Sequence, residues 1–219
     1  MFNITIIFSM HIQIGKCNSI ELYNIINNEN PEIIFEEFDI LRTEDGYYKN
    51  GYYKYQKGST LETFAIMDYL ENNNVKYVPV DTFEVTDFPS EMYKKISIAD
   101  PEYDKLFSES IINAGQEGFQ YLNGIECYNL FEKMHLIEKN VVIKSNDNKL
   151  ISDYNAWQNI SNARDNEMLK NIYEYSKSNY FNNAVFIIGT EHKKSILEKI
   201  DGYNTNENIK INWKPWRIA

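Results

Sequence analysis

Two apolar segments near opposite ends of the chain each lead directly into a histidine. Residues 4–11 read ITIIFSMH and residues 185–192 read VFIIGTEH, and the chain contains only three histidines in all. Short runs of β-branched and apolar residues are typical of strands that are buried on both faces of a parallel sheet. If these two strands are neighbours in one sheet, His11 and His192 lie together at its carboxyl edge, where open α/β folds place their sites.

The spacing of apolar residues predicts an α/β fold with a helical cap. Strands are expected at residues 3–9, 33–39, 75–80, 184–189 and 209–213. Capping pairs at Asn18 and Glu21, and at Ser59 and Glu62, each predict the start of a helix. Helical periodicity then dominates from 101 to 178, and a last helix is expected from Glu191 to about residue 200. We therefore expect one domain with a mainly parallel sheet flanked by helices, a core of about 1–87 and 181–219, and an insertion of about 88–180 forming a cap.

Composition and charge exclude some classes of function. The net charge is −10 and no cluster of lysine or arginine occurs, so nucleic acid is not an expected partner. The tract at residues 4–8 is too short to span a bilayer and has no basic residues before it, so neither a membrane partner nor a signal peptide is expected. Cys17 and Cys127 are isolated in the sequence, which predicts reduced thiols in a cytoplasmic protein. The phosphate-loop, dinucleotide, zincin and nucleophile-elbow motifs are all absent.

Acidic residues end the two predicted strands that lie between the histidine segments: Glu36, Glu37, Asp39 and Asp81. Because the carboxyl ends of parallel strands share one edge, these carboxylates are expected to meet the two imidazoles. Two imidazoles with one or two carboxylates suit a divalent transition metal, and without a metal they suit general-base catalysis. Each residue taken singly is more often a helix cap or a solvated group, but their joint occurrence favours a site.

Further candidate residues lie outside the strands. Arg164 falls in an apolar stripe of the helix predicted at 152–178, so we expect it either to meet an acid at the sheet edge or to extend into solvent. Gly189 is expected to allow a sharp turn, and Glu191 to act as a catalytic acid, to bind a ligand or to complement the helix dipole. His135 is interpreted as a surface or structural residue. The tyrosine-rich stretch 46–58 predicts an exposed loop or hairpin that could also form a lid.

Five short patterns occur in the order known from one group of proteins: residues 8–11 (FSMH), 31–39 (PEIIFEEFD), 78–81 (VPVD), 164–168 (RDNEM) and 185–192 (VFIIGTEH). In this order the chain resembles the TraB/GumN, Tiki, erythromycin-esterase and ChaN-like superfamily, although Phe8 and Ser9 stand where the family has a glycine. The resemblance implies an α/β fold. It also implies functional roles for His11, Glu37 (or Glu36 in a shifted register), Asp81, Arg164 and His192.

The resulting hypothesis is a hydrolase of an ester or amide bond that acts on a small molecule or peptide. His11, His192 and Glu37 are the predicted metal ligands for Mn, Co, Zn or Fe, and His11, Glu37, Arg164 and His192 are the predicted catalytic residues. Glu36, Asp81 and Glu191 are the predicted ligand-binding residues. The alternatives are a non-catalytic protein that binds haem or another small ligand, and an interaction or toxin-like domain with a decayed site.

Overall fold

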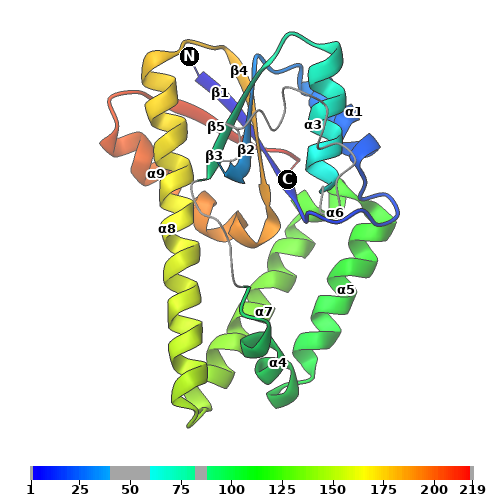
Figure 1. Ribbon diagram of the computed structural model, residues 1–219, viewed down its shortest axis with the longest axis vertical. Coiled ribbons are helices and arrows are strands. Elements are labelled where there is room, and N and C mark those ends of the chain that lie inside the picture. The colour runs from blue at the N-terminus through cyan, green and yellow to red at the C-terminus, as the bar shows by residue number, and fades with distance from the viewer. Residues whose placement is uncertain (1, 40–59, 82–87, 218–219) are drawn as a thin grey trace.

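The computed structural model of the protein describes residues 2–39, 60–81 and 88–217. Its centre is a five-stranded sheet in the order β3-β2-β4-β1-β5, and every neighbouring pair of strands is parallel (Figure 1). The strands are β1 (Phe2–Ser9), β2 (Ile33–Asp39), β3 (Lys76–Asp81), β4 (Asn183–Gly189) and β5 (Ile211–Pro215). The predicted α/β class is confirmed, and the two histidine segments begin on the neighbouring strands β1 and β4.

Helices cover both faces of this sheet. Helices α1 (Ser19–Glu29) and α3 (Leu61–Asn72) pack on one face, and the second half of α8 (Asn148–Ser178) packs with α9 (Lys193–Asn206) on the other (Figure 1). Alternate residues of a strand point to opposite faces. In β2, Phe35 belongs to the core under α8 and α9, whereas Ile34 belongs to the core under α1 and α3. Burial on both faces explains why the strands are apolar at successive positions.

The segment predicted to be a helical insertion is helical. It contains α4 (Ser90–Ala99), α5 (Glu102–Glu117), α6 (Phe119–Asn123), α7 (Ile125–Lys144) and the first half of α8. Most of these helices extend below the sheet in Figure 1 and enclose an apolar core of their own, which includes Met92, Ile96, Leu130 and Met134. The cap therefore lies at the carboxyl edge of the sheet, where β1 and β4 end.

The structure shows one of the two predicted capping pairs. Asn18 caps α1 as predicted, because its side chain accepts a hydrogen bond from the amide of Glu21. The helix α3 is present as predicted, but its predicted capping pair was wrong, because Thr60 is the N-cap and its side chain accepts a hydrogen bond from the amide of Thr63. Glu62, the predicted capping partner, is instead buried and turned toward the end of β1. Ser59 lies outside the described residues.

Several further predictions differ from the structure in detail or concern residues outside its described part. The segment after β4 begins as a short 3₁₀ turn at Thr190–His192, and α9 then runs past the predicted end to Asn206. Cys17 and Cys127 are free, buried thiols. No helix among the described residues is long and apolar enough to cross a membrane. The tyrosine-rich stretch 46–58 and the side chain of Asp39 lie outside the described part of the chain.

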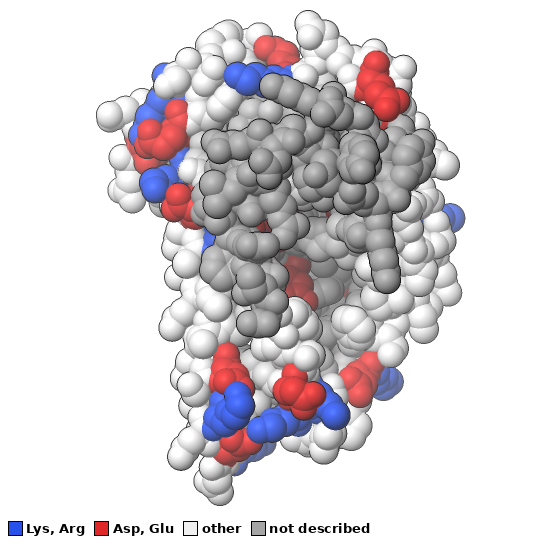
Figure 2. All heavy atoms as spheres, in the orientation of Figure 1, with Lys and Arg blue, Asp and Glu red and all other residues white. Residues whose placement is uncertain are grey.

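Acidic and basic side chains are mixed at the free end of the cap. Figure 2 shows red and blue side chains next to one another there rather than a patch of one sign. Ion pairs join Lys95 to Asp147 at 2.5 Å and Lys149 to Asp153 at 2.6 Å in this region. Exposed pairs of this kind contribute little to stability, so the apolar core and not these charges holds the cap helices together.

Candidate functional site

The two histidine segments end side by side. Ser9, the last residue of β1, pairs with Gly189, the last residue of β4. His11 follows two residues after Ser9 and has a left-handed backbone with a φ of 63°. His192 lies in the 3₁₀ turn that precedes α9. The expectation that the two strands are neighbours is therefore confirmed, and both histidines lie at the carboxyl edge of the sheet.

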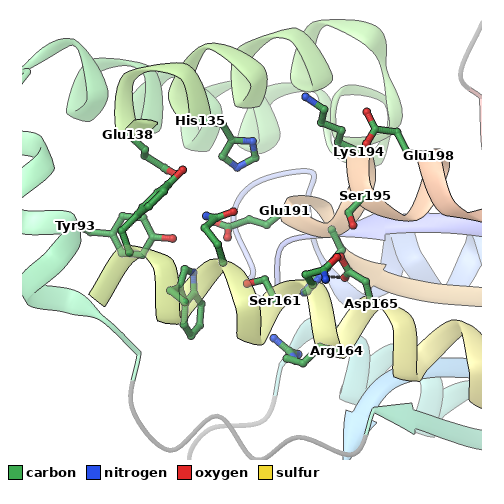
Figure 3. Close-up of a pocket in the computed structure, with 15 residues that line it drawn as sticks. Tyr93, His135, Glu138, Ser161, Arg164, Asp165, Glu191, Lys194, Ser195 and Glu198 are labelled. Carbon is green, nitrogen blue, oxygen red and sulfur yellow. Dashed lines mark hydrogen bonds and ion pairs between the residues drawn. The ribbon is translucent and has the colours of Figure 1, made fainter. Parts of the chain in front are cut away.

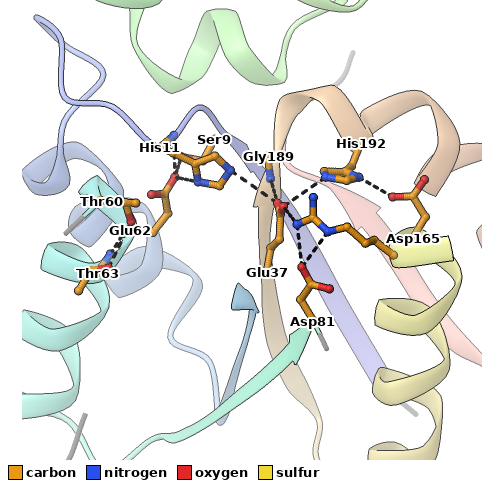
Figure 4. Close-up of polar contacts among 11 residues, drawn as sticks. Ser9, His11, Glu37, Thr60, Glu62, Thr63, Asp81, Asp165, Gly189 and His192 are labelled. Atoms are coloured by element: carbon orange, nitrogen blue, oxygen red, sulfur yellow. Dashed lines mark hydrogen bonds and ion pairs between the residues drawn. The ribbon is translucent and has the colours of Figure 1, made fainter. Parts of the chain in front are cut away.

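Glu37 joins the two imidazoles. Its Oε1 lies 3.2 Å from Nε2 of His192, and its Oε2 lies 3.7 Å from Nε2 of His11 (Figure 4). The backbone amide of Gly189 also donates to Oε2, at 2.6 Å. The side chain of Glu37 is 7% exposed, so this carboxylate is buried among its donors. The two histidines thus belong to one cluster with Glu37 at its centre.

Arg164 contacts acidic side chains at the sheet edge, which is one of the two placements predicted for it. Its guanidinium donates to Oε1 of Glu37 at 2.5 Å, and through two nitrogens to Oδ2 of Asp81 at 2.7 and 3.0 Å (Figure 4). The side chains of Arg164 and Asp81 are 11% and 4% exposed. A guanidinium that is buried at this depth needs carboxylate partners to offset its desolvation, and Glu37 and Asp81 supply them.

Each imidazole is held from its other nitrogen by a second carboxylate. Asp165, next to Arg164 on α8, lies 2.5 Å from Nδ1 of His192. Glu62, from α3, lies 3.3 Å from Nδ1 of His11 and also accepts from the backbone amide of His11 and from the hydroxyl of Ser9. These contacts leave both Nε2 atoms facing Glu37. Sequence reasoning assigned neither Asp165 nor Glu62 to the site.

Gly189 is required because the site is crowded, and the expected sharp turn is wrong. Its backbone is extended, with φ −60° and ψ 142°, which any residue can adopt. A Cβ atom at this position would lie 2.8 Å from Nε2 of His11 and 3.1 Å from Oε2 of Glu37. The absence of a side chain lets the strand end approach the ring and carboxylate closely enough for its amide to bind Glu37.

The electrostatics of the cluster favour charged forms. Burial lowers the pKa of His192, but the charge of Glu37 and the hydrogen bond to Asp165 outweigh it and raise the pKa to about 10. Burial likewise lowers the pKa of His11, and the charges of Glu62 and Glu37 raise it to about 9. Burial raises the pKa of Glu37, yet His192, His11 and Arg164 hold it well below its usual range. At neutral pH both imidazoles are therefore protonated and Glu37 is ionised.

The donor types at the cluster fit a divalent transition metal. Two imidazole Nε2 atoms face one carboxylate, and each Nδ1 is bound to a further carboxylate, as is common around metal-binding histidines. Binding a metal would require both Nε2 atoms to release their protons. Among the described residues, no three histidine, cysteine, aspartate or glutamate side chains are spaced as a metal-binding group. Metal binding stays a prediction.

The remaining predicted residues are divided between the cluster and its surroundings. Asp81 binds Arg164 and thus belongs to the cluster. Glu36 lies on the α1 and α3 side, where it accepts from the hydroxyl of Tyr77 at 2.5 Å, so it is separated from Glu37 by the sheet. Glu191 is exposed and lines the space beside His192. His135 projects from α7 and lies 3.8 Å from Glu132.

A cavity of about 620 Å³ opens onto the cluster. His11, Glu37, Arg164 and His192 form its polar part. Its walls are largely apolar and come from the first junction and the cap: Met10, Ile12, Phe88, Phe107, Ile111, Phe131 and Trp157. His11 is the most open member of the cluster, with a side chain that is 44% exposed. A ligand of drug-like size with an apolar body and a polar reacting group fits this combination.

Comparisons with known proteins give no relative. No protein family matches the chain, and no curated protein or solved structure matches it. The resemblance to the TraB/GumN, Tiki, erythromycin-esterase and ChaN-like superfamily is therefore untested. The function has to be argued from the cluster itself.

Proposed function

We propose that the protein is a hydrolase of ester or amide bonds, with His11, Glu37, Arg164 and His192 as its reactive centre. The observation that carries the proposal is the shared carboxylate: both Nε2 atoms face Glu37, and each Nδ1 is held by a separate acid. Imidazoles oriented in this way are suited to move protons to and from a substrate. The apolar cavity beside them would hold the body of the substrate.

The two histidines are suited to different roles. The side chain of His11 is 44% exposed and open to the cavity, so we assign it the role of base. The side chain of His192 is 10% exposed and lies between two carboxylates that favour its protonated form, so we assign it the role of acid. Glu37 is a weak base because its pKa is held low, and its role is to orient both rings.

In the proposed reaction, His11 acts in the molecules in which it has lost its Nε2 proton, a fraction that grows as the pH rises toward 9. It then takes a proton from water as the water oxygen attacks the carbonyl carbon. The carbonyl oxygen becomes negative, and Arg164 and the protonated His192 favour that charge. The carbon–oxygen or carbon–nitrogen bond of the substrate then breaks, and the leaving group takes a proton from His192. Asp165 keeps the imidazole of His192 aligned throughout because it is bound to Nδ1, so the proton that the leaving group takes comes from Nε2, the nitrogen that faces Glu37 before the reaction.

A metal-dependent route is the alternative to this acid–base route at the same centre. The ligands of Mn, Co, Zn or Fe would be His11, His192 and Glu37, after the two imidazoles lose their Nε2 protons, and the two imidazoles would then not act as base and acid. A divalent ion held there would supply Lewis-acid activation of the carbonyl group. Glu62 and Asp165 would then act on the Nδ1 atoms as the outer carboxylates that orient metal-binding imidazoles.

A panel of 4-nitrophenyl esters and anilides tests the proposal. The wild-type protein is assayed after chelation and after reloading with each of the four metals, beside the variant His11→Gln. We expect release of nitrophenol or nitroaniline that falls at least about 100-fold in the variant. No turnover under any condition would contradict the proposal. A Soret band on haem titration that disappears in His11→Gln would then support the haem-binding alternative.

A further inference from the structure

A second cavity, of about 350 Å³, lies between the cap and the start of α9. We call it the cap pocket. Its walls come from α4, α7, α8, α9 and the turn before α9, and Figure 3 shows Tyr93, Glu138 and Glu191 around one space. Trp157, Arg164 and His192 line both this pocket and the larger cavity, so the two spaces adjoin. The cap pocket has no part in the proposed hydrolysis.

The carboxylate of Glu138 is buried in this pocket without a cationic partner among the described residues. Glu138 is 3% exposed, and among the described residues it accepts one hydrogen bond, from the hydroxyl of Tyr103 at 3.1 Å. Burial raises the pKa of Glu138 to about 7; the Tyr103 bond opposes this shift and the charge of Glu191 adds to it. A buried carboxylate is costly unless a positive charge or several donors accompany it. Its environment therefore favours a cation that the described side chains do not supply.

The basic side chains that line the cap pocket are already paired with acids. His135 lies 3.8 Å from Glu132, and His192 lies between Glu37 and Asp165. Nζ of Lys194 lies 2.5 Å from Glu132, on the neighbouring helix α7. The guanidinium of Arg164 is bound to Glu37 and Asp81. Glu138 and Glu191 thus leave the pocket with unbalanced negative charge.

Aromatic rings form much of the remaining wall. Tyr93, Tyr154 and Trp157 line the cap pocket together with the carboxylates. Tyr93 stacks on Phe88, with ring centres 5.2 Å apart, and on Tyr103, with ring centres 6.1 Å apart, so its faces are taken by other rings. Phe88 meets the ring of Trp157 edge-on at 5.7 Å. Faces of tryptophan and tyrosine attract cations through the ring quadrupole, and this attraction is strongest when the cation has few bound waters. Quaternary ammonium groups are the ligands that best meet this condition.

From this combination we propose that the cap pocket binds an organic cation, with an ammonium group that lies between the carboxylates of Glu138 and Glu191 and the ring of Trp157. Binding of this kind needs no hydrolysis, so it can be tested separately from the proposed reaction. Because the two cavities adjoin at His192, a longer cationic ligand would reach the reactive centre from the cap pocket. In that case the cap pocket would select substrates that carry a positive charge.

Calorimetric titration with choline tests this inference on the full chain. The matched probe is 3,3-dimethylbutan-1-ol, which has the same shape and hydroxyl group as choline but a carbon in place of the charged nitrogen. Equal concentrations of sodium chloride correct for ionic strength. We expect saturable binding of choline and binding of the neutral alcohol that is at least about tenfold weaker. No saturation with choline, or equal binding of the two probes, would overturn the inference.

Two variants locate the bound cation. Glu138→Gln removes the charge but keeps a carbonyl oxygen for the hydroxyl of Tyr103, so the fold should persist and choline binding should weaken at least about tenfold. Glu126→Gln, on the exposed surface of the same helix, should bind choline as the wild type does. Unchanged binding in Glu138→Gln would place choline elsewhere and overturn the assignment. The comparison of choline with its neutral isostere uses the wild type and does not depend on either variant.

Discussion

Gly189 and His11 lie so close that no side chain fits between them. A Cβ at Gly189 would lie 2.8 Å from Nε2 of His11, closer than real Cβ atoms approach another heavy atom. The ring of His11 is fixed on its other side by Glu62, which binds both its Nδ1 and its backbone amide. The end of β4 can therefore not gain a methyl group at Gly189 without moving the ring of His11 or the carboxylate of Glu37.

The variant Gly189→Ala should thus be destabilised by about 1–3 kcal/mol, the usual range for overpacking a filled site. Urea unfolding measures this loss. Gly202→Ala is the matched control, because Gly202 lies on an exposed part of α9 with nothing within 4 Å of its missing Cβ. That change should be neutral or stabilising by up to about 1 kcal/mol. Equal stability of the two variants would show that the close approach is not maintained in solution.

Arg164 is predicted to be the most costly member of the cluster to remove. Arg164→Met would leave Glu37 and Asp81 buried without their shared cation, and breaking a buried pair in this way costs about 3–5 kcal/mol. Lys170→Met removes an exposed lysine from its pair with Glu167 on the same helix and should cost less than about 1 kcal/mol. Guanidinium chloride unfolding of both variants tests the contrast. A loss below 1 kcal/mol in Arg164→Met would contradict the buried pairing.

Asp165 should control the protonation of His192. The hydrogen bond to Asp165 is one of the contributions that raise the pKa of His192 to about 10. Asp165→Asn removes the negative charge at Nδ1, so the pKa of His192 should fall by roughly one unit or more. NMR titration of the imidazole nitrogens in the wild type and the variant measures this change. A pKa of His192 that does not change would rule out the contact with Asp165.

Stability should fall as the pH is raised through the range in which the two imidazoles titrate. Their pKa values in the folded protein, about 9 and about 10, lie above the unfolded value of 6.5, so the folded state holds more protons in between. Their contribution is thus complete below about pH 6.5 and is lost as the pH rises toward 10. Unfolding in EDTA at several pH values should give a steeper decline for the wild type than for His192→Gln. Parallel curves would mean that His192 is not stabilised as a cation.

Much of the site was predictable from order and periodicity. Apolar runs identified the strands, and parallel topology then required His11 and His192 to share an edge with the acids that end β2 and β3. The position of Arg164 in an apolar stripe left two placements open, and the structure shows the one with carboxylate partners. The choice between Glu36 and Glu37 could not be made, because β2 is buried on both faces and successive apolar residues do not reveal which face a polar residue joins.

The acids that orient the imidazoles were missed for a different reason. Glu62 and Asp165 each begin an apolar stripe, with Ile66 and Tyr69 following Glu62 at helical spacing, and Leu169 and Ile172 following Asp165. This spacing indicates a buried acid, but a glutamate in the first turn of a helix is usually interpreted as a cap or dipole partner. The imidazoles that these acids meet come from distant segments. Only the tertiary structure brings them together.

Glu37 is the centre of the reactive cluster, so its substitution is the most direct test. Glu36, its neighbour in β2, provides the control. The hydrolysis of 4-nitrophenyl esters is to be compared in Glu37→Gln and Glu36→Gln, at a temperature where circular dichroism shows both variants folded. Glu37→Gln should lose at least about 100-fold in kcat/KM. Glu36→Gln should stay within about threefold of the wild type, because its side-chain carbonyl still accepts from Tyr77 on the face of the sheet opposite Glu37. Equal losses in the two variants, or wild-type activity in Glu37→Gln, would contradict the account.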